Sequence, residues 1–264
     1  MMKPTSNAAS GADASAVIDI RHLVKRHAGR PVVDNVSFRA QAGHITAFLG
    51  PNGAGKSSTL RILLGLDRAD GGEALVCGKP YRRLADPLRA VGFTMDGPAA
   101  NRGRSARNHL AWVALAAGLP SSRVDEVLAM TGLSGAANMK VGGFSLGMGQ
   151  RLALATAMLG DPKVLVLDEP MNGLDPEGIR WMRGFLRREA DRGRAVLMSS
   201  HLMGEVEETA DDVVVIAAGH VLATGSLEQV RGSHASLEDA FFALTEGKEQ
   251  YNAAGPDDAG REVR

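Results

Sequence analysis

An excess of charge is the first property that this sequence of 264 residues lacks. Lys and Arg total 30, Asp and Glu total 30, and the formal net charge is zero. Proteins that bind nucleic acids or anionic lipid surfaces commonly carry an excess of basic residues, and this composition shows none. Any contact with DNA or a membrane must therefore be local, and we expect no nucleic-acid partner.

Cysteine is also nearly absent. The single residue, Cys77, excludes an internal disulfide framework and is typical of a reducing compartment. A lone cysteine in such a protein is most often a small buried hydrophobe. We therefore expect Cys77 to be buried and assign it no function.

Long apolar runs are missing as well. Runs such as LAWVALAAGL, residues 110–119, fall well short of the roughly 18 residues that a membrane-spanning helix needs. The first 16 residues contain one Lys and no apolar segment after it, which is unlike a secretion signal. We expect a chain that is neither secreted nor membrane-spanning by itself.

Apolar residues make up 44% of the chain, which suffices for a hydrophobic core. Short apolar or alternating segments predict strands. They occupy residues 16–24, 33–40, 44–50 and 71–78, and later 163–169, 195–200 and 212–225. Because the later strands are continuously apolar and alternate with helical patterns, we expect an α/β protein with a buried, largely parallel sheet.

The middle of the chain has a different pattern. Helical patterns follow one another over about residues 97–157 with no strand candidate between them, which predicts an inserted helical subdomain. Further on, Asp175 is placed to cap a helix that has Pro176 at its first position. We expect one main domain over 16–232, a C-terminal helix over 233–247, and disordered tails at 1–15 and 248–264.

One motif points directly to nucleotide chemistry. GPNGAGKSS matches the pattern G-x-x-x-x-G-K-[ST] and lies between a strand pattern and a helix pattern. Glycines let backbone N–H groups close around phosphates, Lys56 is expected to reach the β and γ oxygens, and the Ser57 hydroxyl is expected to bind Mg²⁺. The predicted cradle for ATP and Mg²⁺ consists of Gly50, Pro51, Asn52, Gly53, Ala54, Gly55, Lys56, Ser57 and Ser58.

Two later strands end in side chains suited to hydrolysis. KVLVLDEP ends in Asp168 and Glu169, and ligands of parallel sheets bind at the carboxyl ends of strands. An acidic pair alone is more often part of a solvated turn. In a chain that also contains a phosphate-loop motif, a functional acidic pair is the better interpretation. We expect Asp168 to hold Mg²⁺ and Glu169 to polarise the attacking water as general base. His201 follows another apolar strand and is expected to reach the γ-phosphate or that water.

A second Gly/Ser-rich turn, GGFSLGMGQR at residues 142–151, leads into the N-terminus of a helix. Such a turn is an anion site because backbone N–H groups and the helix dipole both favour negative charge. A single domain seldom needs two phosphate cradles for one nucleotide. The second cradle therefore requires an explanation beyond the first.

The phosphate loop, helical insert, FSLGMGQR, VLVLDEP, NGLDP and SSH occur in an order that resembles the ATP-binding cassette of ABC transporters, over about residues 17–228. The resemblance implies a P-loop NTPase (RecA-like) core, an N-terminal antiparallel β subdomain, the inserted α-helical subdomain, and ATP hydrolysis. FSLGMGQR is similar to the family signature L-S-G-G-Q, in which Ser145 and Gly147 would contact phosphate. Because two cassettes of this family meet head to tail, the second cradle would serve the ATP of a partner, either a second copy or another cassette.

The same resemblance implies two further contacts. His27 stands where the family has an aromatic residue that stacks on adenine. Asp96 stands where the family usually has Gln, near Mg²⁺ and against the membrane partner. An acidic residue there, the SLGM signature and the ending SLEDAFFALTEG resemble drug and bacitracin-resistance exporters. This resemblance implies transmembrane permease subunits as partners and a cytoplasmic place on the inner face of the cell membrane.

Two alternatives remain open. A soluble ABC ATPase acting on DNA or ribosomes is disfavoured because the chain has no long coiled-coil insertion, no second cassette, no Cys-x-x-Cys pair and no basic excess. A regulatory cassette without hydrolysis would explain His27, Asp96 and the altered signature. Retention of Lys56, Ser57, Asp168, Glu169 and His201 argues against it. The sequence does not identify the transported substrate.

Overall fold

The computed structural model describes residues 16–95 and 100–245. The predicted tails, 1–15 and 248–264, and the candidate residue Asp96 lie outside the described residues. The domain boundaries drawn from the sequence stay a prediction. No helix in the described ranges is both long and apolar enough to span a bilayer.

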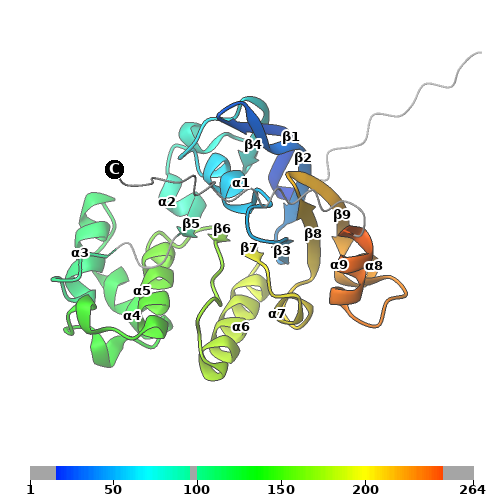
Figure 1. Ribbon diagram of the computed structural model, residues 1–264. Coiled ribbons are helices and arrows are strands. Elements are labelled where there is room, and N and C mark those ends of the chain that lie inside the picture. Colours follow the sequence, from blue (N-terminus) through cyan, green and yellow to red (C-terminus); the bar gives the residue numbers. More distant parts are fainter. Residues whose placement is uncertain (1–15, 96–99, 246–264) are drawn as a thin grey trace, which may run out of the picture.

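The centre of the molecule is a six-stranded sheet (Figure 1). Its strands, in spatial order, are β5 (Val91–Thr94), β6 (Val164–Leu167), β7 (Ala195–Ser200), β3 (Ile45–Leu49), β8 (Asp212–Ala217) and β9 (His220–Ser226). All neighbours are parallel except β8 and β9, which are antiparallel. The expected buried, largely parallel sheet is therefore confirmed.

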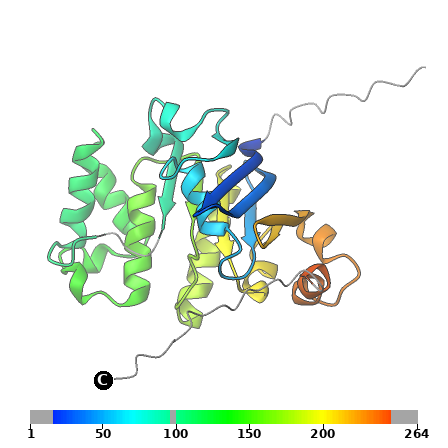
Figure 2. The same ribbon diagram turned by 45° about the horizontal axis from the view of Figure 1, so that its top comes forward.

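A second sheet has three antiparallel strands, in the order β2 (Arg30–Gln41), β1 (Ala16–His27) and β4 (Gly71–Val76). It lies next to α1 (Lys56–Leu63), as Figures 1 and 2 show. Together the two sheets confirm the predicted fold class.

The prediction for Cys77 was wrong. The residue follows β4 in a tight turn, where Val76 pairs with Lys79, and its side chain is exposed. A Cβ at the neighbouring Gly78 would meet no atom within 4 Å, so no apolar layer covers this turn.

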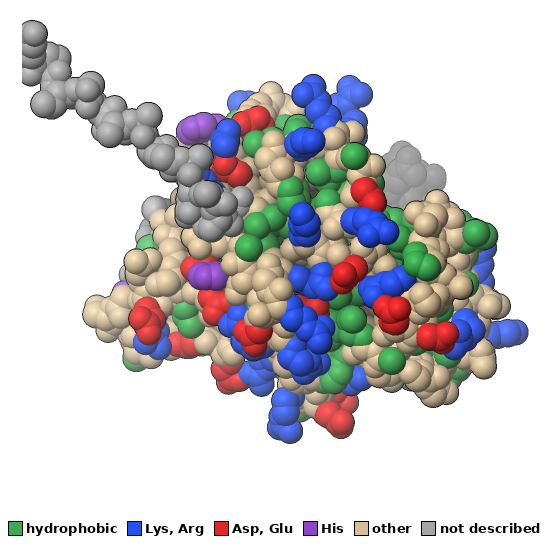
Figure 3. Space-filling view, turned by 180° about the vertical axis from the view of Figure 1, so that it is seen from behind, with side chains coloured by type: hydrophobic (Ala, Val, Ile, Leu, Met, Phe, Trp, Pro, Cys, Tyr) green, Lys and Arg blue, Asp and Glu red, His purple; other side chains and the backbone are tan. Residues whose placement is uncertain are grey.

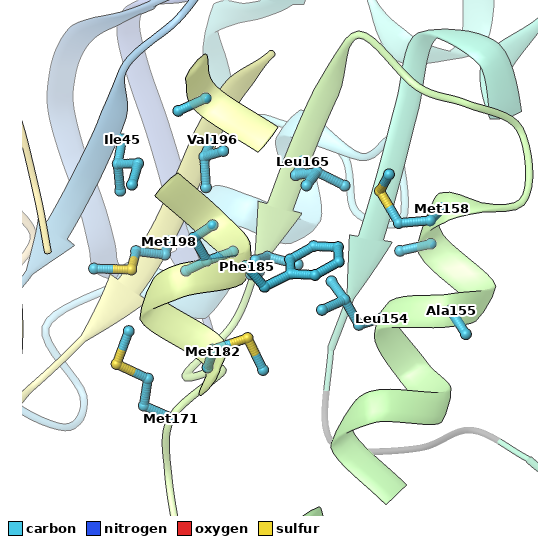
Figure 4. Close-up of a cluster of buried hydrophobic side chains, with 14 of the residues drawn as sticks. Ile45, Leu154, Ala155, Met158, Leu165, Met171, Met182, Phe185, Val196 and Met198 are labelled. Atoms are coloured by element: carbon cyan, nitrogen blue, oxygen red, sulfur yellow. The ribbon is translucent and has the colours of Figure 1, made fainter. Parts of the chain in front are cut away.

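Alternate residues of each strand point to opposite faces of the large sheet, and both faces of its inner strands are covered by packed side chains. On one side, Phe48 and Leu197 belong to a cluster that includes Leu60 of α1 and residues of the small sheet. On the other side, Leu165 and Met198 pack in a second cluster with the helices below the sheet. Figure 4 shows this second cluster around Phe185.

The helices α3 (Ala106–Ala116), α4 (Ser122–Met130) and α5 (Leu146–Met158) follow one another between β5 and β6, and they lie beyond the β5 edge of the large sheet (Figures 1 and 2). The strand β5 was not among the predicted strands, because a run of only four residues gives a weak strand pattern. At Gly92 of this strand a Cβ would lie 2.2 Å from the Ala157 carbonyl oxygen, so the close approach of α5 requires glycine.

The helix α6 (Pro176–Asp191) begins where the sequence predicts. Asp175 accepts a hydrogen bond from the Gly178 N–H at 2.7 Å, and Pro176 occupies the first turn. The remaining helices are α2 (Pro87–Ala90), α7 (Met203–Glu207), α8 (Leu227–Arg231) and α9 (Leu237–Thr245), with short 3₁₀ segments at Tyr81–Arg83, Ser134–Ala136 and Val141–Gly143. On the face seen in Figure 3, basic and acidic side chains are interspersed.

The packing of α6 on the sheet leads to a stability prediction. Phe185 is 1% exposed, and its removal by Phe185→Ala should lower the free energy of unfolding by about 3–5 kcal/mol because a cavity remains. Phe242 of α9 is 56% exposed, so Phe242→Ala is the matched control and should cost less than about 1 kcal/mol. Urea unfolding of the two variants measures both values, and equal losses would contradict this account of the core.

Candidate active site

The phosphate loop joins β3 to α1 and is held by backbone contacts that only glycine permits. At Gly50 a Cβ would lie 2.2 Å from the Ile216 carbonyl oxygen, and at Gly55 it would lie 2.4 Å from the Val32 carbonyl oxygen. Gly55 also has a φ of 104°, in the left-handed region. The turn is therefore packed against the start of β2 and the end of β8, which fixes the direction in which α1 begins.

Lys56 is the first residue of α1, and its side chain is only 6% exposed. Its ammonium group donates to the carbonyl oxygens of Gly50 at 2.6 Å and Pro51 at 3.3 Å. It also lies 3.3 Å from Oε1 of Glu169. The positive charge is thus held inside the loop, next to a carboxylate from another strand.

The other residues of the loop and of the first turn of α1 differ in exposure. Asn52 and Gly53 are exposed at its tip, and Ala54 is buried. Ser57 is exposed and Ser58 is partly buried, both in the first turn of α1. Backbone N–H groups in the first turn of a helix lack partners within the helix, so this turn is suited to receive phosphate oxygens.

Asp168 and Glu169 directly follow β6, and Ser199 of the neighbouring β7 connects them. The Ser199 hydroxyl donates to Oδ1 of Asp168 and accepts a hydrogen bond from the Glu169 N–H at 2.9 Å. Glu169 has a φ of 47°, which is unusual for a residue with a side chain. Sequence reasoning missed this role of Ser199, although its place two residues before His201 at a strand end was a usable signal.

The Glu169 carboxylate joins the phosphate loop to His201. Its Oε2 lies 2.9 Å from Nδ1 of His201, and its Oε1 faces the Lys56 ammonium. These side chains come from the carboxyl ends of β6, β7 and β3, which are adjacent in the sheet. The structure therefore brings together three residues that are far apart in the sequence.

One more carboxylate lies beside this group. Glu205 of α7 lines a small cleft together with Glu169 and Ser199, and its Oε2 is buried without a hydrogen-bond partner among the described residues. Burial raises the pKa of Glu205, and the Glu169 carboxylate adds to the rise, whereas Arg183 and His201 oppose it. The sequence contained no specific signal for this residue.

The second cradle lies elsewhere in the molecule. Ser145 caps α5, and its hydroxyl accepts a hydrogen bond from the Met148 N–H at 3.2 Å. Ser145 is exposed, and the neighbouring Leu146 is 52% exposed. Because α5 lies beyond the β5 edge while α1 follows the central strand β3, Ser145 and Gly147 are not part of the group around Lys56 (Figures 1 and 2).

His27 is the last residue of β1 and is exposed. The tight turn that follows it contains Ala28 and Gly29, both with positive φ. Val32, just beyond the turn on β2, lies against Gly55 of the phosphate loop. The hairpin that carries His27 thus borders the loop, and stacking of His27 on a base stays a prediction.

The described residues contain no group of three or more His, Cys, Asp or Glu side chains placed to hold a metal ion. Mg²⁺ needs no such group, since it commonly takes one or two protein ligands and completes its shell with waters and substrate phosphates. Ser57 and Asp168 are available as such ligands.

Comparison with known proteins agrees with this geometry. The family model described as ABC transporter matches residues 33–172. The bacitracin transport ATP-binding protein BcrA of Bacillus licheniformis is 37% identical over 211 residues, which cover 79% of this chain and 72% of that protein. The lantibiotic transport ATP-binding protein SrtF of Streptococcus pyogenes is 34% identical over 225 residues, which cover 85% of this chain and 96% of that protein.

Solved structures give the same result. The ATP-binding subunit of an ABC transporter superposes with a TM-score of 0.79 at 26% identity, covering 87% of this chain and 99% of that one. The cbiO1 protein from Clostridium perfringens, part of the ABC transporter complex cbiONQ, superposes with a TM-score of 0.73 at 26% identity. The superposition covers 82% of this chain and 90% of that one. This chain therefore belongs to the ABC transporter family, and it is an ATP-binding subunit of the kind that hydrolyses ATP.

Proposed function

We propose that this subunit hydrolyses ATP at the group formed by Lys56, Glu169 and His201 and thereby drives export by separate membrane subunits. The observation that carries the proposal is the Glu169 carboxylate, which contacts Lys56 on one side and His201 on the other. At one edge of the sheet, this arrangement places the Lys56 ammonium, which would bind phosphate, next to the Glu169 carboxylate, which would accept a proton from water.

Binding of ATP would begin at the phosphate loop. The Lys56 ammonium now donates to two loop carbonyl oxygens, and phosphate oxygens would replace these neutral acceptors with charged ones. The N–H groups of the loop and of the first turn of α1 would complete the cradle. Burial of Lys56 favours this exchange, because a charge shielded from water interacts strongly with an anion.

Mg²⁺ would be held by the Ser57 hydroxyl and by Asp168, directly or through its bound water. When bound, Mg²⁺ neutralises negative charge on the phosphate oxygens. The hydrogen bond from Ser199 orients the Asp168 carboxylate, leaving its other oxygen for this task.

Hydrolysis would use Glu169 and His201 as a pair. Glu169 would accept a proton from the attacking water, whose oxygen forms the new bond to the γ-phosphorus as the bond to the β,γ-bridging oxygen breaks. His201, at hydrogen-bond distance from the same carboxylate, would orient Glu169 and contact the γ-phosphate. The hydrogen bond that the backbone N–H of Glu169 donates to the Ser199 hydroxyl holds the backbone of Glu169 in place.

We propose that Ser145 and Gly147 act on the ATP of a partner cassette. Their place on α5, away from the chain's own phosphate loop, supports a head-to-tail dimer in which each nucleotide contacts both subunits. The exposed Ser145 and Leu146 at this helix N-terminus favour an intermolecular surface. A second copy of this chain or a different cassette would serve equally in this geometry.

The names of the relatives support the exporter part of the proposal. BcrA is named for bacitracin transport and SrtF for lantibiotic transport. By this likeness the subunit would dock on transmembrane permease subunits at the cytoplasmic face of the cell membrane and drive export of a drug, antibiotic or peptide. None of these relatives supports the alternative of an ATPase that acts on DNA or ribosomes.

Two substitutions separate nucleotide binding from hydrolysis. Lys56→Ala should weaken ATP binding about tenfold or more, because charged hydrogen bonds to the phosphates are lost. Glu169→Gln should retain ATP binding while the turnover rate falls by about 10²-fold or more, because the general base is lost. Fluorescent-nucleotide titration and phosphate release measure the two effects.

Lys79→Ala is the control for these variants, since Lys79 is exposed in the turn after β4. This substitution should leave the affinity for ATP and the turnover rate unchanged. Wild-type turnover by Glu169→Gln would contradict the role of this residue. Wild-type affinity of Lys56→Ala would contradict the phosphate-loop assignment.

Mixing of subunits tests the head-to-tail arrangement. Ser145→Arg places a bulky side chain on the turn that would face the partner's phosphate, and Lys56→Ala removes the chain's own phosphate contact. Each homodimer should be inactive. A mixed dimer contains one complete site, so phosphate release should reappear on mixing. If Ser145→Arg instead abolishes ATP binding to its own isolated monomer, the turn acts within one chain and the proposal is wrong.

Purification from the membrane tests the exporter assignment. A tagged copy of this chain, expressed in its native host and extracted with mild detergent, should co-purify with a separately encoded integral membrane protein, identified by mass spectrometry. The ATPase rate of the subunit should be several-fold higher in the reconstituted complex than in the free subunit. Recovery of ribosomal or DNA-bound proteins in place of a membrane protein would contradict this part of the proposal.

A further inference from the structure

An aromatic side chain and a guanidinium group connect the helix of the second cradle to α6. The guanidinium carbon of Arg151, on α5, lies 3.9 Å from the centre of the Trp181 ring on α6. Nη1 of Arg151 also donates to the carbonyl oxygen of Thr131, the C-cap residue of α4, at 3.3 Å. The side chain of Arg151 therefore connects its own helix, α5, to α6 and to the end of α4.

The stack continues into the core. Trp181 packs against Phe185, one turn further along α6, with 5.5 Å between ring centres. Phe185 is almost fully buried among the side chains below the large sheet (Figure 4). Arg151, Trp181 and Phe185 thus form a continuous column from α5 to the sheet that carries the catalytic residues.

The backbone at Gly132 lies close to the guanidinium of Arg151. Gly132 has a φ of 72°, and a Cβ at this position would lie 2.8 Å from Nη1 of Arg151. No carboxylate in the described part of the chain forms an ion pair with Arg151, so stacking and the Thr131 carbonyl determine where its guanidinium lies.

A second contact lies one turn earlier on α5. A Cβ at Gly173 would lie 2.6 Å from the side chain of Leu146, and one at Gly147 would lie 3.7 Å from Leu174. The first turn of α5 therefore touches the loop that precedes α6, and Arg151 touches α6 itself. Two contacts about one helical turn apart define both the position of the α5 N-terminus and its rotation about the helix axis.

We propose that Arg151 and Trp181 are positioning residues of the composite ATP site. Their stack sets the rotation of α5 against α6 so that Ser145 and Gly147 face the nucleotide of the partner subunit. Neither residue touches that nucleotide. The inference rests on the proposed head-to-tail dimer and adds the device that aligns the second cradle with the core. A planar guanidinium is required, because the ammonium group of lysine does not stack in the same way.

The experiment compares two mixed dimers with the same substitutions in different subunits. In the first, a Lys56→Ala subunit is paired with a Trp181→Leu subunit, and the working phosphate loop faces an unaltered α5. In the second, a subunit with both substitutions is paired with a wild-type subunit, and the working phosphate loop faces the altered α5. Dimers are purified through two different tags, and the reference is Lys56→Ala paired with wild type.

The first dimer should release phosphate at the rate of the reference. The second should be slower by about tenfold or more, since small misplacements of a positioning group are costly. Arg151→Lys in place of Trp181→Leu should give the same asymmetry, that is, the same difference in the rate of phosphate release between the two dimers. A general loss of stability would affect both dimers alike, so equal rates in the two dimers would overturn the proposal.

Trp112→Leu is the matched control. Trp112 on α3 also has an arginine over its ring, Arg104 at 5.0 Å, but it is 55% exposed, and α5 lies between α3 and α6 (Figure 1). It should produce no asymmetry, and an asymmetry of equal size would also overturn the proposal.

The same pairs in a Glu169→Gln background provide a measurement that needs no turnover. The first dimer should retain bound ATP through gel filtration and the second should lose it. Equal retention would overturn the proposal. Absence of ATP hydrolysis by the wild-type dimer would instead contradict the proposed function.

Discussion

The parallel pairing of β6, β7 and β3 is the constraint on which the candidate site depends. In a parallel sheet all strands end at the same edge, and the register aligns Leu49 with Ser200 and Leu167 with Met198. The residues that follow each strand therefore meet in space. This pairing brings Lys56, Glu169 and His201 into contact, with the Glu169 carboxylate between a cation and an imidazole.

Burial of this sheet on both faces keeps the edge rigid. Its inner strands are formed by apolar residues with almost no exposed surface, packed against α1 on one side and α6 on the other. Within this apolar setting the hydroxyl of Ser199 satisfies Asp168 and the Glu169 N–H at once. An unsatisfied polar group at such a place would be costly, so these bonds hold the unusual backbone of Glu169.

The helical insert has a different relation to the core. It follows β5 and returns through α5 to β6, so its second cradle is carried by the helix beside β5 and not by the helix α1 that follows β3 (Figure 1). In the head-to-tail dimer that we propose, the ATP site is divided between two chains, and each half must be held accurately by its own chain. For the phosphate loop this is done by backbone contacts at Gly50 and Gly55, and for α5 we assign it to Arg151 and Trp181.

The sequence by itself determined the fold class, the phosphate loop, and the strands that end in Asp168, Glu169 and His201, because glycine spacing and apolar runs are local patterns. Only the tertiary structure decided the strand order, the edge strand β5, the exposure of Cys77, and the roles of Ser199 and Glu205. Arg151 and Trp181 likewise became neighbours only through packing. These features depend on which distant segments pack together, and that choice is made by the burial of whole layers, which no local pattern specifies.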